Sequence, residues 1–275
     1  MSTPVDPEPR IPAAEGAETE PRLPAAEGLE PDPQIPQETV PLAPHHPSAE
    51  AGKDRAPTIT LEQVQGNEEL SSFISAADRV MEGLGFTEHG FRHANLVANI
   101  SYQVLARLGF GEHDANLGCV AGYLHDVGNM LTRHSHAQTG ALLVHQALKG
   151  ELPVADLAQM LAAIANHEET DGMAVSPVSA AVILADKSDV HRSRVRKSGQ
   201  IRFDIHDRVN YAAEQSFLRV DSEARTVTLE LTIDTEISQV MEYFEIFLGR
   251  MQMCRHAAET LDCRFRLLIN GAELA

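Results

Sequence analysis

The spacing of apolar residues changes twice along this chain of 275 residues, and these changes limit the folds open to it. Residues 1–57 have no periodic apolar pattern and hold 13 of the 15 prolines. From residue 58 to about 215, apolar residues recur every three to four positions, as in amphipathic helices. Strict alternation then appears at 226–233 and 263–269, which predicts strands. We therefore expect a tail, a mostly helical domain (58–215) and a small α+β unit (216–275).

The tail, residues 1–57, contains no aromatic residue and carries 11 acidic and 4 basic residues. A segment with so little apolar mass cannot offset the entropy lost on ordering, so we predict that it is disordered. Two roles are open to it. It could be a binding tail or spacer in an extended, polyproline-like form, or a solvated acidic tail without a specific partner.

The overall charge and the absence of targeting signals narrow the class of protein. The formal net charge is -18 and the pI is about 5.1, which argues against binding nucleic acid or an anionic membrane surface. No apolar run approaches the roughly 18 residues of a membrane span, and the N-terminus lacks the pattern of a signal peptide. The spacing of Cys119, Cys254 and Cys263 fits neither a disulfide framework nor a metal motif. We expect a soluble, cytoplasmic protein.

Glycine, proline and small polar residues divide the helical region into segments. Glycines end several apolar stripes, whereas Pro153 and Pro177 stand where first-turn prolines belong. The predicted helices run from 67 to about 82, 87 to 108, 112 to 125, 136 to 148, 153 to 167 and 176 to about 190, with a further helix at 236–262 in the α+β unit.

Histidines and aspartates stand at selected places in these helices. His125 and Asp126 are adjacent at the end of a very apolar helix, and Asp186 interrupts another apolar helix. Burying an unpaired charge is costly, so these side chains are expected to face a polar site. Four further histidines surround them in sequence: His89 and His93, four residues apart on one predicted helix face, and then His136 and His167. Imidazoles and carboxylates on successive helices are what a metal site in a helical bundle requires.

The order His93, His125-Asp126, Asp186 resembles the HD-domain superfamily of metal-dependent phosphohydrolases over roughly residues 85–200. The resemblance includes the residues around the doublet (122–128) and around the last aspartate (185–189). It extends to the HD-GYP group of cyclic-dinucleotide phosphodiesterases, with four departures. Asn129 stands where that group has a lysine, and its Gly-Tyr-Pro element is missing. Asn166 and His167 stand where a histidine pair is expected, and His89 replaces a glutamate used by some members. Cyclic di-GMP is therefore not implied as the substrate.

The resemblance implies a helical HD bundle and a set of metal ligands. His93, His125, Asp126 and Asp186 would hold one divalent ion, and Asp126 would bridge to a second ion held by His136 and His167. The donor set suits Mn, Fe, Zn, Ni, Co or Mg ions, and either one or two ions are expected. A metal-activated hydroxide would then attack phosphorus in a phosphate monoester or diester. His89 or His134 would protonate the leaving oxygen.

A basic cluster follows the last predicted ligand. Six basic residues lie between 187 and 202, among them Lys187, Arg192, Arg194 and Arg196. Beside a metal site they would bind a nucleotide or another small phosphorylated substrate, although an ordinary solvated basic turn is the alternative. The α+β unit shows no catalytic motif, and its exposed edge is a candidate surface for a homodimer or for a ligand.

Two other functions fit the same residues. The set of four histidines and two aspartates also resembles the small di-iron oxygenase branch of the HD superfamily. Alternatively, the metal-bound HD domain and the C-terminal unit would form a non-enzymatic sensor or interaction module.

Overall fold

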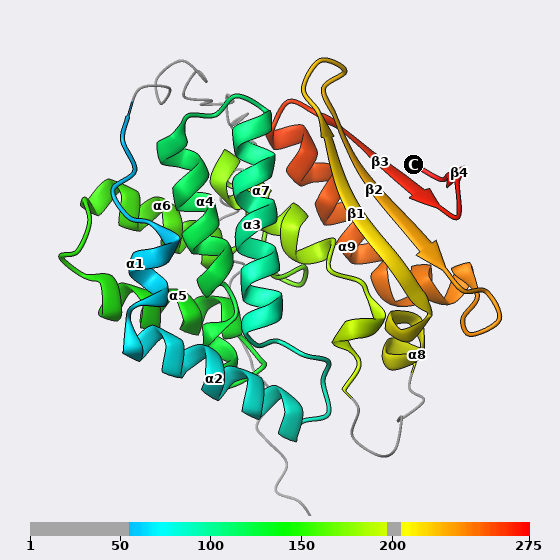
Figure 1. The fold of residues 1–275 in the computed structure, drawn as a ribbon, viewed down its shortest axis with the longest axis horizontal. Helices are drawn as coiled ribbons and strands as arrows, with labels where there is room; N and C mark the ends of the chain where they lie inside the picture. Colours follow the sequence, from blue (N-terminus) through cyan, green and yellow to red (C-terminus); the bar gives the residue numbers. More distant parts are fainter. Residues whose placement is uncertain (1–54, 197–204) are drawn as a thin grey trace, which may run out of the picture. The chain divides into compact units, whose positions relative to one another are not determined.

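The computed structural model describes residues 55–196 and 205–275, and most of the predicted helices occur in the expected order (Figure 1). The prediction of disorder for 1–57 falls, apart from residues 55–57, outside the described residues. The helical part consists of α1 (Leu61–Gln65), α2 (Glu68–Gly83), α3 (Phe91–Arg107), α4 (Glu112–Leu124), α5 (His136–Leu148), α6 (Val154–Ala165) and α7 (Pro177–Lys187), with the 3-10 turns η1 (Val127–Met130) and η2 (Arg192–Arg194).

Polar caps start two of these helices where the sequence predicts. The Asn67 side chain accepts hydrogen bonds from two backbone N–H groups in the first turn of α2. The Ser176 hydroxyl accepts the N–H of Ser179 at 3.1 Å, and Pro177 occupies the first turn of α7. Both helices are therefore defined by local polar contacts as well as by packing.

The start of α3 differs from the prediction. The helix expected to open at 87–88 begins at Phe91, with Gly90 before it. The carboxylate of Asp78 accepts the backbone N–H of His89 at 3.0 Å, which holds this residue in the preceding loop. His89 and His93 therefore do not share a face of one helix.

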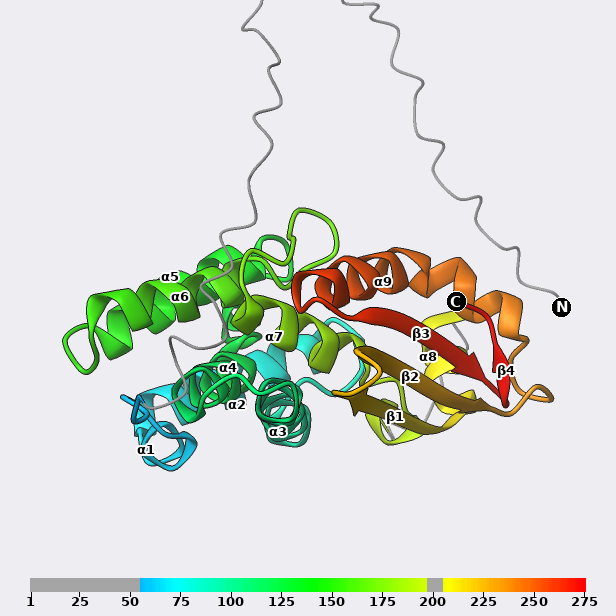
Figure 2. The same cartoon turned by 90° about the horizontal axis from the view of Figure 1, so that it is seen from above.

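The C-terminal part is a four-stranded sheet with one long helix. In strand order, β1 (Ala213–Asp221) pairs antiparallel with β2 (Thr226–Ile233), β2 pairs parallel with β3 (Arg264–Ile269), and β3 pairs antiparallel with β4 (Ala272–Glu273). Helix α9 (Val240–Thr260) connects the two parallel strands, and Figure 2 shows it along one face of the sheet. The apolar residues that alternate along β2 and β3 are buried on that face: Val227, Leu229, Leu231, Ile233, Phe265, Leu267 and Ile269.

The fold class is thus the predicted one, a helical bundle followed by a small α+β unit. The sequence did not indicate α8 (Ile205–Ala212) or β1, in which Phe217 is 50 % exposed and the apolar alternation is weak. The sheet begins at Ala213, so residue 215 lies inside its first strand. The described residues belong to one compact unit, and their division into two domains stays a prediction.

Helix α7 is the central element that joins the two parts (Figure 1). It packs against α3, α4 and α6 on the helical side and against α9 on the other. Every residue from Pro177 to Ala185 is buried, which explains why the sequence is apolar all around this helix. Its C-terminal end carries Asp186 into the interior. No helix among the described residues has the length and apolar character needed to cross a membrane.

Candidate metal centre

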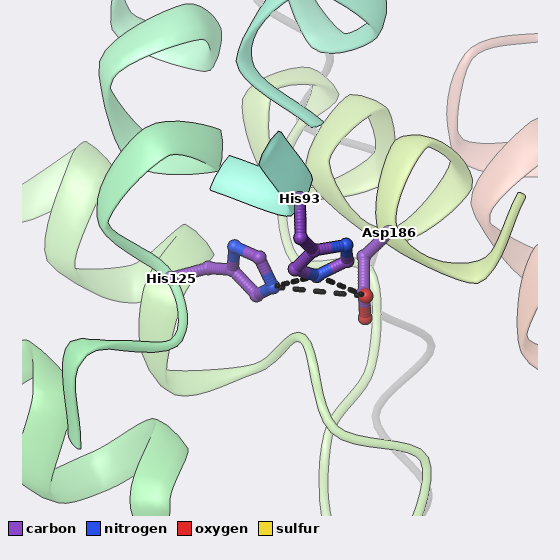
Figure 3. A group of neighbouring side chains, drawn as sticks. All are labelled: His93, His125 and Asp186. Atoms are coloured by element: carbon purple, nitrogen blue, oxygen red, sulfur yellow. Dashed lines mark hydrogen bonds and ion pairs between the residues drawn. The ribbon is translucent and has the colours of Figure 1, made fainter. Parts of the chain in front are cut away.

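Three elements bring the residues of the predicted first metal site together. His93 comes from α3, His125 directly follows α4, and Asp186 lies near the end of α7 (Figure 3). The Nε2 atoms of the two histidines are 3.2 Å apart, and the Oδ1 atom of Asp186 lies 3.4 Å from His93 Nε2 and 3.6 Å from His125 Nε2. Ligand atoms bound to one ion at about 2.0–2.2 Å are themselves separated by about 3.0–3.5 Å in tetrahedral or octahedral arrangements. The observed spacing therefore fits a common ion.

A second histidine pair lies on the other side of Asp126. The Nε2 atoms of His136 and His167 are 3.0 Å apart. Oδ1 of Asp126 lies 3.3 Å from His136 Nε2 and 3.7 Å from His167 Nε2, whereas Oδ2 lies 3.6 Å from His93 Nε2 and 3.4 Å from His125 Nε2. The two oxygens of one carboxylate thus face two separate histidine pairs.

Tight turns place these ligand candidates. His125 and His167 each follow the last turn of a helix, and His136 is the first residue of α5. A Cβ atom on Gly128 would lie 1.9 Å from the carbonyl oxygen of His136, so only glycine allows the turn η1 to approach α5 this closely. This close approach keeps Asp126 next to His136.

Hydrogen bonds at Nδ1 fix the orientation of all four imidazoles. The acceptors are the Asp189 carboxylate for His93 (2.7 Å) and backbone carbonyls for His125 (2.8 Å), His136 (3.0 Å) and His167 (2.6 Å). Acceptors at Nδ1 favour the tautomer whose proton is on Nδ1, which leaves the Nε2 lone pairs free. Two pairs of such lone pairs then face each other at 3.0–3.2 Å, which is repulsive unless a proton or a metal ion lies between them. The donor arrangement therefore fits divalent metal ions.

Charges in the centre also favour a cation. Burial opposes ionisation of Asp126. The charge of His125 and hydrogen bonds from the neighbouring histidines outweigh this effect and hold the pKa of Asp126 well below the usual range. Burial would lower the pKa of His125, yet the charges of Asp126 and Asp186 and hydrogen bonds to them raise it to about 10. For His167, burial dominates and lowers the pKa to about 4. A proton on His125 consequently competes with a metal ion for the same nitrogen.

Asp189 is a residue of the centre to which the sequence assigned no role. Its carboxylate accepts one hydrogen bond from His93 and two from Arg92, the latter at 3.3 and 2.8 Å. Arg194 donates to the Asp189 carbonyl oxygen at 2.9 Å. Burial opposes ionisation of Asp189, but the charge of Arg194 and the bonds from His93 and Arg92 keep its pKa well below the usual range. Asp189 is therefore a charged support for His93.

Asn129 supports the other carboxylate. It stands where HD-GYP proteins have a lysine, and its side-chain N–H donates to Asp126 Oδ1 at 2.8 Å and to the Asp126 carbonyl oxygen at 3.1 Å. The residue that departs from the family pattern thus orients the central aspartate.

The basic residues predicted to bind substrate have partners within the protein. Buried Lys187 pairs with Asp186 at 2.8 Å and with Glu169 at 2.6 Å, and Arg250 of α9 donates to Glu169 at 2.9 Å. Arg194 bonds backbone carbonyls and Asp189. Arg192 pairs with Glu214 at 3.0 Å and Arg196 pairs with Asp78, while Lys197 and Arg202 lie outside the described residues. Substrate binding by these cations stays a prediction.

The two candidate general acids occupy different environments. The His89 ring lies 5.6 Å from the His93 ring, and its Nδ1 bonds the Thr87 carbonyl oxygen at 2.7 Å. Burial and the charge of Arg194 lower the pKa of His89 well below its ordinary value. His134 is exposed and lines a pocket of about 370 Å³ together with His136 and other residues. His89 is therefore within the centre and His134 at its entrance.

Two further residues of this pocket were missed by sequence reasoning. Arg133 pairs with Glu168 at 3.3 Å, and Glu168 Oε2 is 3.3 Å from His136 Nε2. His136, His167 and Glu168 are close enough to hold an ion together. Glu168 directly follows His167 in the sequence, which is the one local signal that could have identified it.

Comparison with known proteins agrees with this arrangement. The family model for the HD domain matches residues 90–191, a range that contains all six predicted metal ligands. The chain is also 25 % identical to the uncharacterized protein MJ1020 of Methanocaldococcus jannaschii over 213 residues, which cover 68 % of this chain and 81 % of that protein. The closer relation to the HD-GYP group stays a prediction. The match of residues 90–191 to the HD domain spans the whole histidine and aspartate cluster and supports membership of the HD-domain superfamily.

Proposed function

We propose that this chain is a metal-dependent phosphohydrolase that cleaves a phosphate ester of a nucleotide or another small molecule. The position of Asp126 supports the proposal most directly, because its two carboxylate oxygens face two different histidine pairs. A bridging carboxylate between two nitrogen-rich sites is suited to a pair of divalent ions. Such pairs are common in enzymes that hydrolyse phosphate esters.

The residues would divide into two ligand groups. His93, His125 and Asp186 would hold one ion, His136 and His167 the other, and Asp126 both. Divalent ions bound there would supply a water of lowered pKa and would offset the charge on the phosphoryl oxygens. One ion alone, or Glu168 as an added ligand, would fit the same donors.

The remaining residues of the centre would orient these groups and move a proton. Asp189 and Asn129 hold His93 and Asp126 in place through the hydrogen bonds described above. His89 or His134 would protonate the leaving oxygen. His89 is the nearer to His93, whereas His134 is the one that lines the open pocket.

Steady-state hydrolysis tests the proposal. Purified protein is treated with a chelator, reloaded with Mn²⁺, Fe²⁺, Zn²⁺, Ni²⁺, Co²⁺ or Mg²⁺, and screened against nucleotides and small phosphate esters, with metal content measured in each sample. Asp126→Ala should abolish hydrolysis while the protein stays folded. The matched control is Asp114→Ala, near the other end of α4 and about 16 Å from His125 along the helix.

Each outcome separates the functions considered. Hydrolysis that needs metal and Asp126, but not Asp114, supports the proposal. Full activity of metal-loaded Asp126→Ala would contradict it. Iron-loaded protein with a mixed-valent EPR signal and no hydrolysis would favour the di-iron oxygenase, and metal binding without any turnover would favour the sensor module.

A further inference from the structure

The pocket beside the second histidine pair contains a cation that the proposed function leaves without a role. Among the described residues that line it, Arg133 is the one lysine or arginine, next to His134, Ser135, His136, Glu168 and Thr170. The Arg133 side chain is 30 % exposed, and its guanidinium lies 5.8 Å from the centre of the Phe86 ring. It therefore stands between solvent and the metal centre.

The present partners of Arg133 are groups that a substrate would compete with. Its Nη1 lies 3.1 Å from Nε2 of His136, and its Nη2 lies 3.3 Å from Oε2 of Glu168. The contact with His136 uses the Nε2 lone pair, which in the proposed function would bind a metal ion. Once that lone pair is occupied, Glu168 is the remaining described charge partner of Arg133, and a guanidinium can exchange one carboxylate for a phosphoryl group with similar geometry.

The other cations near the centre are held more firmly. Lys187 lies between two carboxylates and has a side chain only 4 % exposed. Arg92 and Arg194 bind Asp189, and Arg250 binds Glu169. Each of them supports a protein group, so among the cations that the structure describes near the centre Arg133 is the best placed to meet an incoming anion.

We propose that Arg133 is the phosphate-binding residue of this centre and makes it prefer phosphate monoesters to diesters. This inference rests on the proposed function. A monoester carries about two negative charges at neutral pH and three terminal oxygens, whereas a diester carries one charge and two terminal oxygens. A forked guanidinium at the entrance therefore stabilises the monoester more. In the reaction the P–O bond to the alcohol breaks, water supplies the new oxygen on phosphorus, and a proton from water goes to the alcohol.

The test compares two substrates in matched variants of the full chain. The substrates are 4-nitrophenyl phosphate, a monoester, and bis(4-nitrophenyl) phosphate, a diester. The variants are Arg133→Gln, Arg133→Lys and the control Arg107→Gln, whose arginine is exposed and lies about 21 Å from His93 along α3. Binding of inorganic phosphate to the metal-loaded proteins is measured by calorimetry, and metal content and circular dichroism are recorded for each.

Arg133→Gln should lower kcat/KM for the monoester about 10- to 100-fold and weaken phosphate binding by a similar factor. The diester should change less than about threefold, since it lacks the third oxygen. Arg133→Lys should restore part of the loss, because it keeps the charge without the fork. Arg107→Gln should behave like the unmodified protein, and metal content should be equal throughout.

The results that overturn this inference differ from those that overturn the proposed function. If the unmodified protein hydrolyses esters and Arg133→Gln keeps its monoester preference and phosphate affinity, Arg133 has no such role. If the unmodified protein hydrolyses neither ester, the binding of inorganic phosphate alone tests whether Arg133 binds phosphate. Weaker binding in Arg133→Gln but not in Arg107→Gln supports the phosphate subsite, whereas equal binding, or none in any variant, contradicts it.

Discussion

At the residue scale, the orientation of His93 depends on Asp189, a carboxylate outside the predicted ligand set. The Asp189 carboxylate accepts a hydrogen bond from Nδ1 of His93, and Arg92 and Arg194 keep Asp189 charged. Residues that orient a metal-binding histidine in this way usually contribute strongly to metal affinity. No local pattern reveals this role, because His93 and Asp189 are 96 positions apart in the sequence.

We predict that Asp189→Ala lowers the affinity for the first metal ion by about 10- to 100-fold. The ring of His93 would lose its fixed tautomer and orientation, while the direct ligands remain. Competition with a metal-sensitive dye measures the affinity, and Asp114→Ala serves as the control. Equal affinity in the two variants would show that Asp189 is a structural ion-pair partner only.

At the scale of elements, the centre depends on the contact between the turn η1 and helix α5. A methyl group on Gly128 would meet the carbonyl oxygen of His136 at 1.9 Å and the backbone N of Gly140 at 2.5 Å. Backbone atoms cannot move aside as a flexible side chain can. The turn and the helix would have to separate, and Asp126 would move away from the second histidine pair.

Gly128→Ala should therefore destabilise the fold by about 1–3 kcal/mol or more and reduce the number of metal ions bound per chain. The control is Gly83→Ala, at the end of α2, where an added methyl group meets no atom within 4 Å. Thermal unfolding and metal analysis are the measurements. A Gly128→Ala protein as stable and metal-rich as Gly83→Ala would contradict the proposed role of this contact.

Buried helices could be predicted from the sequence, whereas the exposed edge strand and the loop before α3 could not. Helices α2 to α7 have strong apolar stripes, and α7 is buried on all sides, so their existence was clear from sequence. Strand β1 lies at a sheet edge with Phe217 half exposed, so its alternation is weak. His89 was placed on a helix because its spacing to His93 is helical, but the Asp78 carboxylate binds its backbone and keeps it in a loop.

At the scale of the whole molecule, a chain of ion pairs connects the C-terminal unit to the candidate metal centre. Arg250 of α9 binds Glu169, Glu169 binds Lys187, and Lys187 binds Asp186. Packing of α7 against α9 brings these groups together. The α+β unit is therefore in contact with a predicted ligand through two intervening side chains.

A residue that directly hydrogen-bonds a metal ligand typically changes metal affinity by about tenfold or more. Arg250→Gln should weaken metal binding by less than this, because two side chains stand between Arg250 and Asp186. The double variant Arg250→Gln/Lys187→Met should lose less metal affinity than the two single variants lose together, since both changes act on one network. Metal titration of the single and double variants measures this, with exposed Arg255→Gln on the same helix as the control. Fully additive losses would show that α9 and the centre are independent.

The sequence predicts six metal ligands because their types and helix positions are unusual. The structure brings all six side chains close together, and their role as ligands stays a prediction. The sequence did not identify Arg133, Glu168 or the partners of the basic cluster. These depend on which residues from distant segments meet, as when Lys187 meets Glu169 and Arg250. The charge of a side chain is visible in a sequence, but its partner is not.

The most direct test of the central claim is the rate of phosphate-ester hydrolysis as a divalent ion is added back to chelator-treated protein. If the proposed two-ion centre around Asp126 forms, there should be no hydrolysis without metal and a rate that rises until two ions are bound per chain. Saturation at one ion would restrict the centre to a single site. Hydrolysis that persists without any metal, or its absence with every ion and ester tested, would contradict the proposal that this chain is a metal-dependent phosphohydrolase.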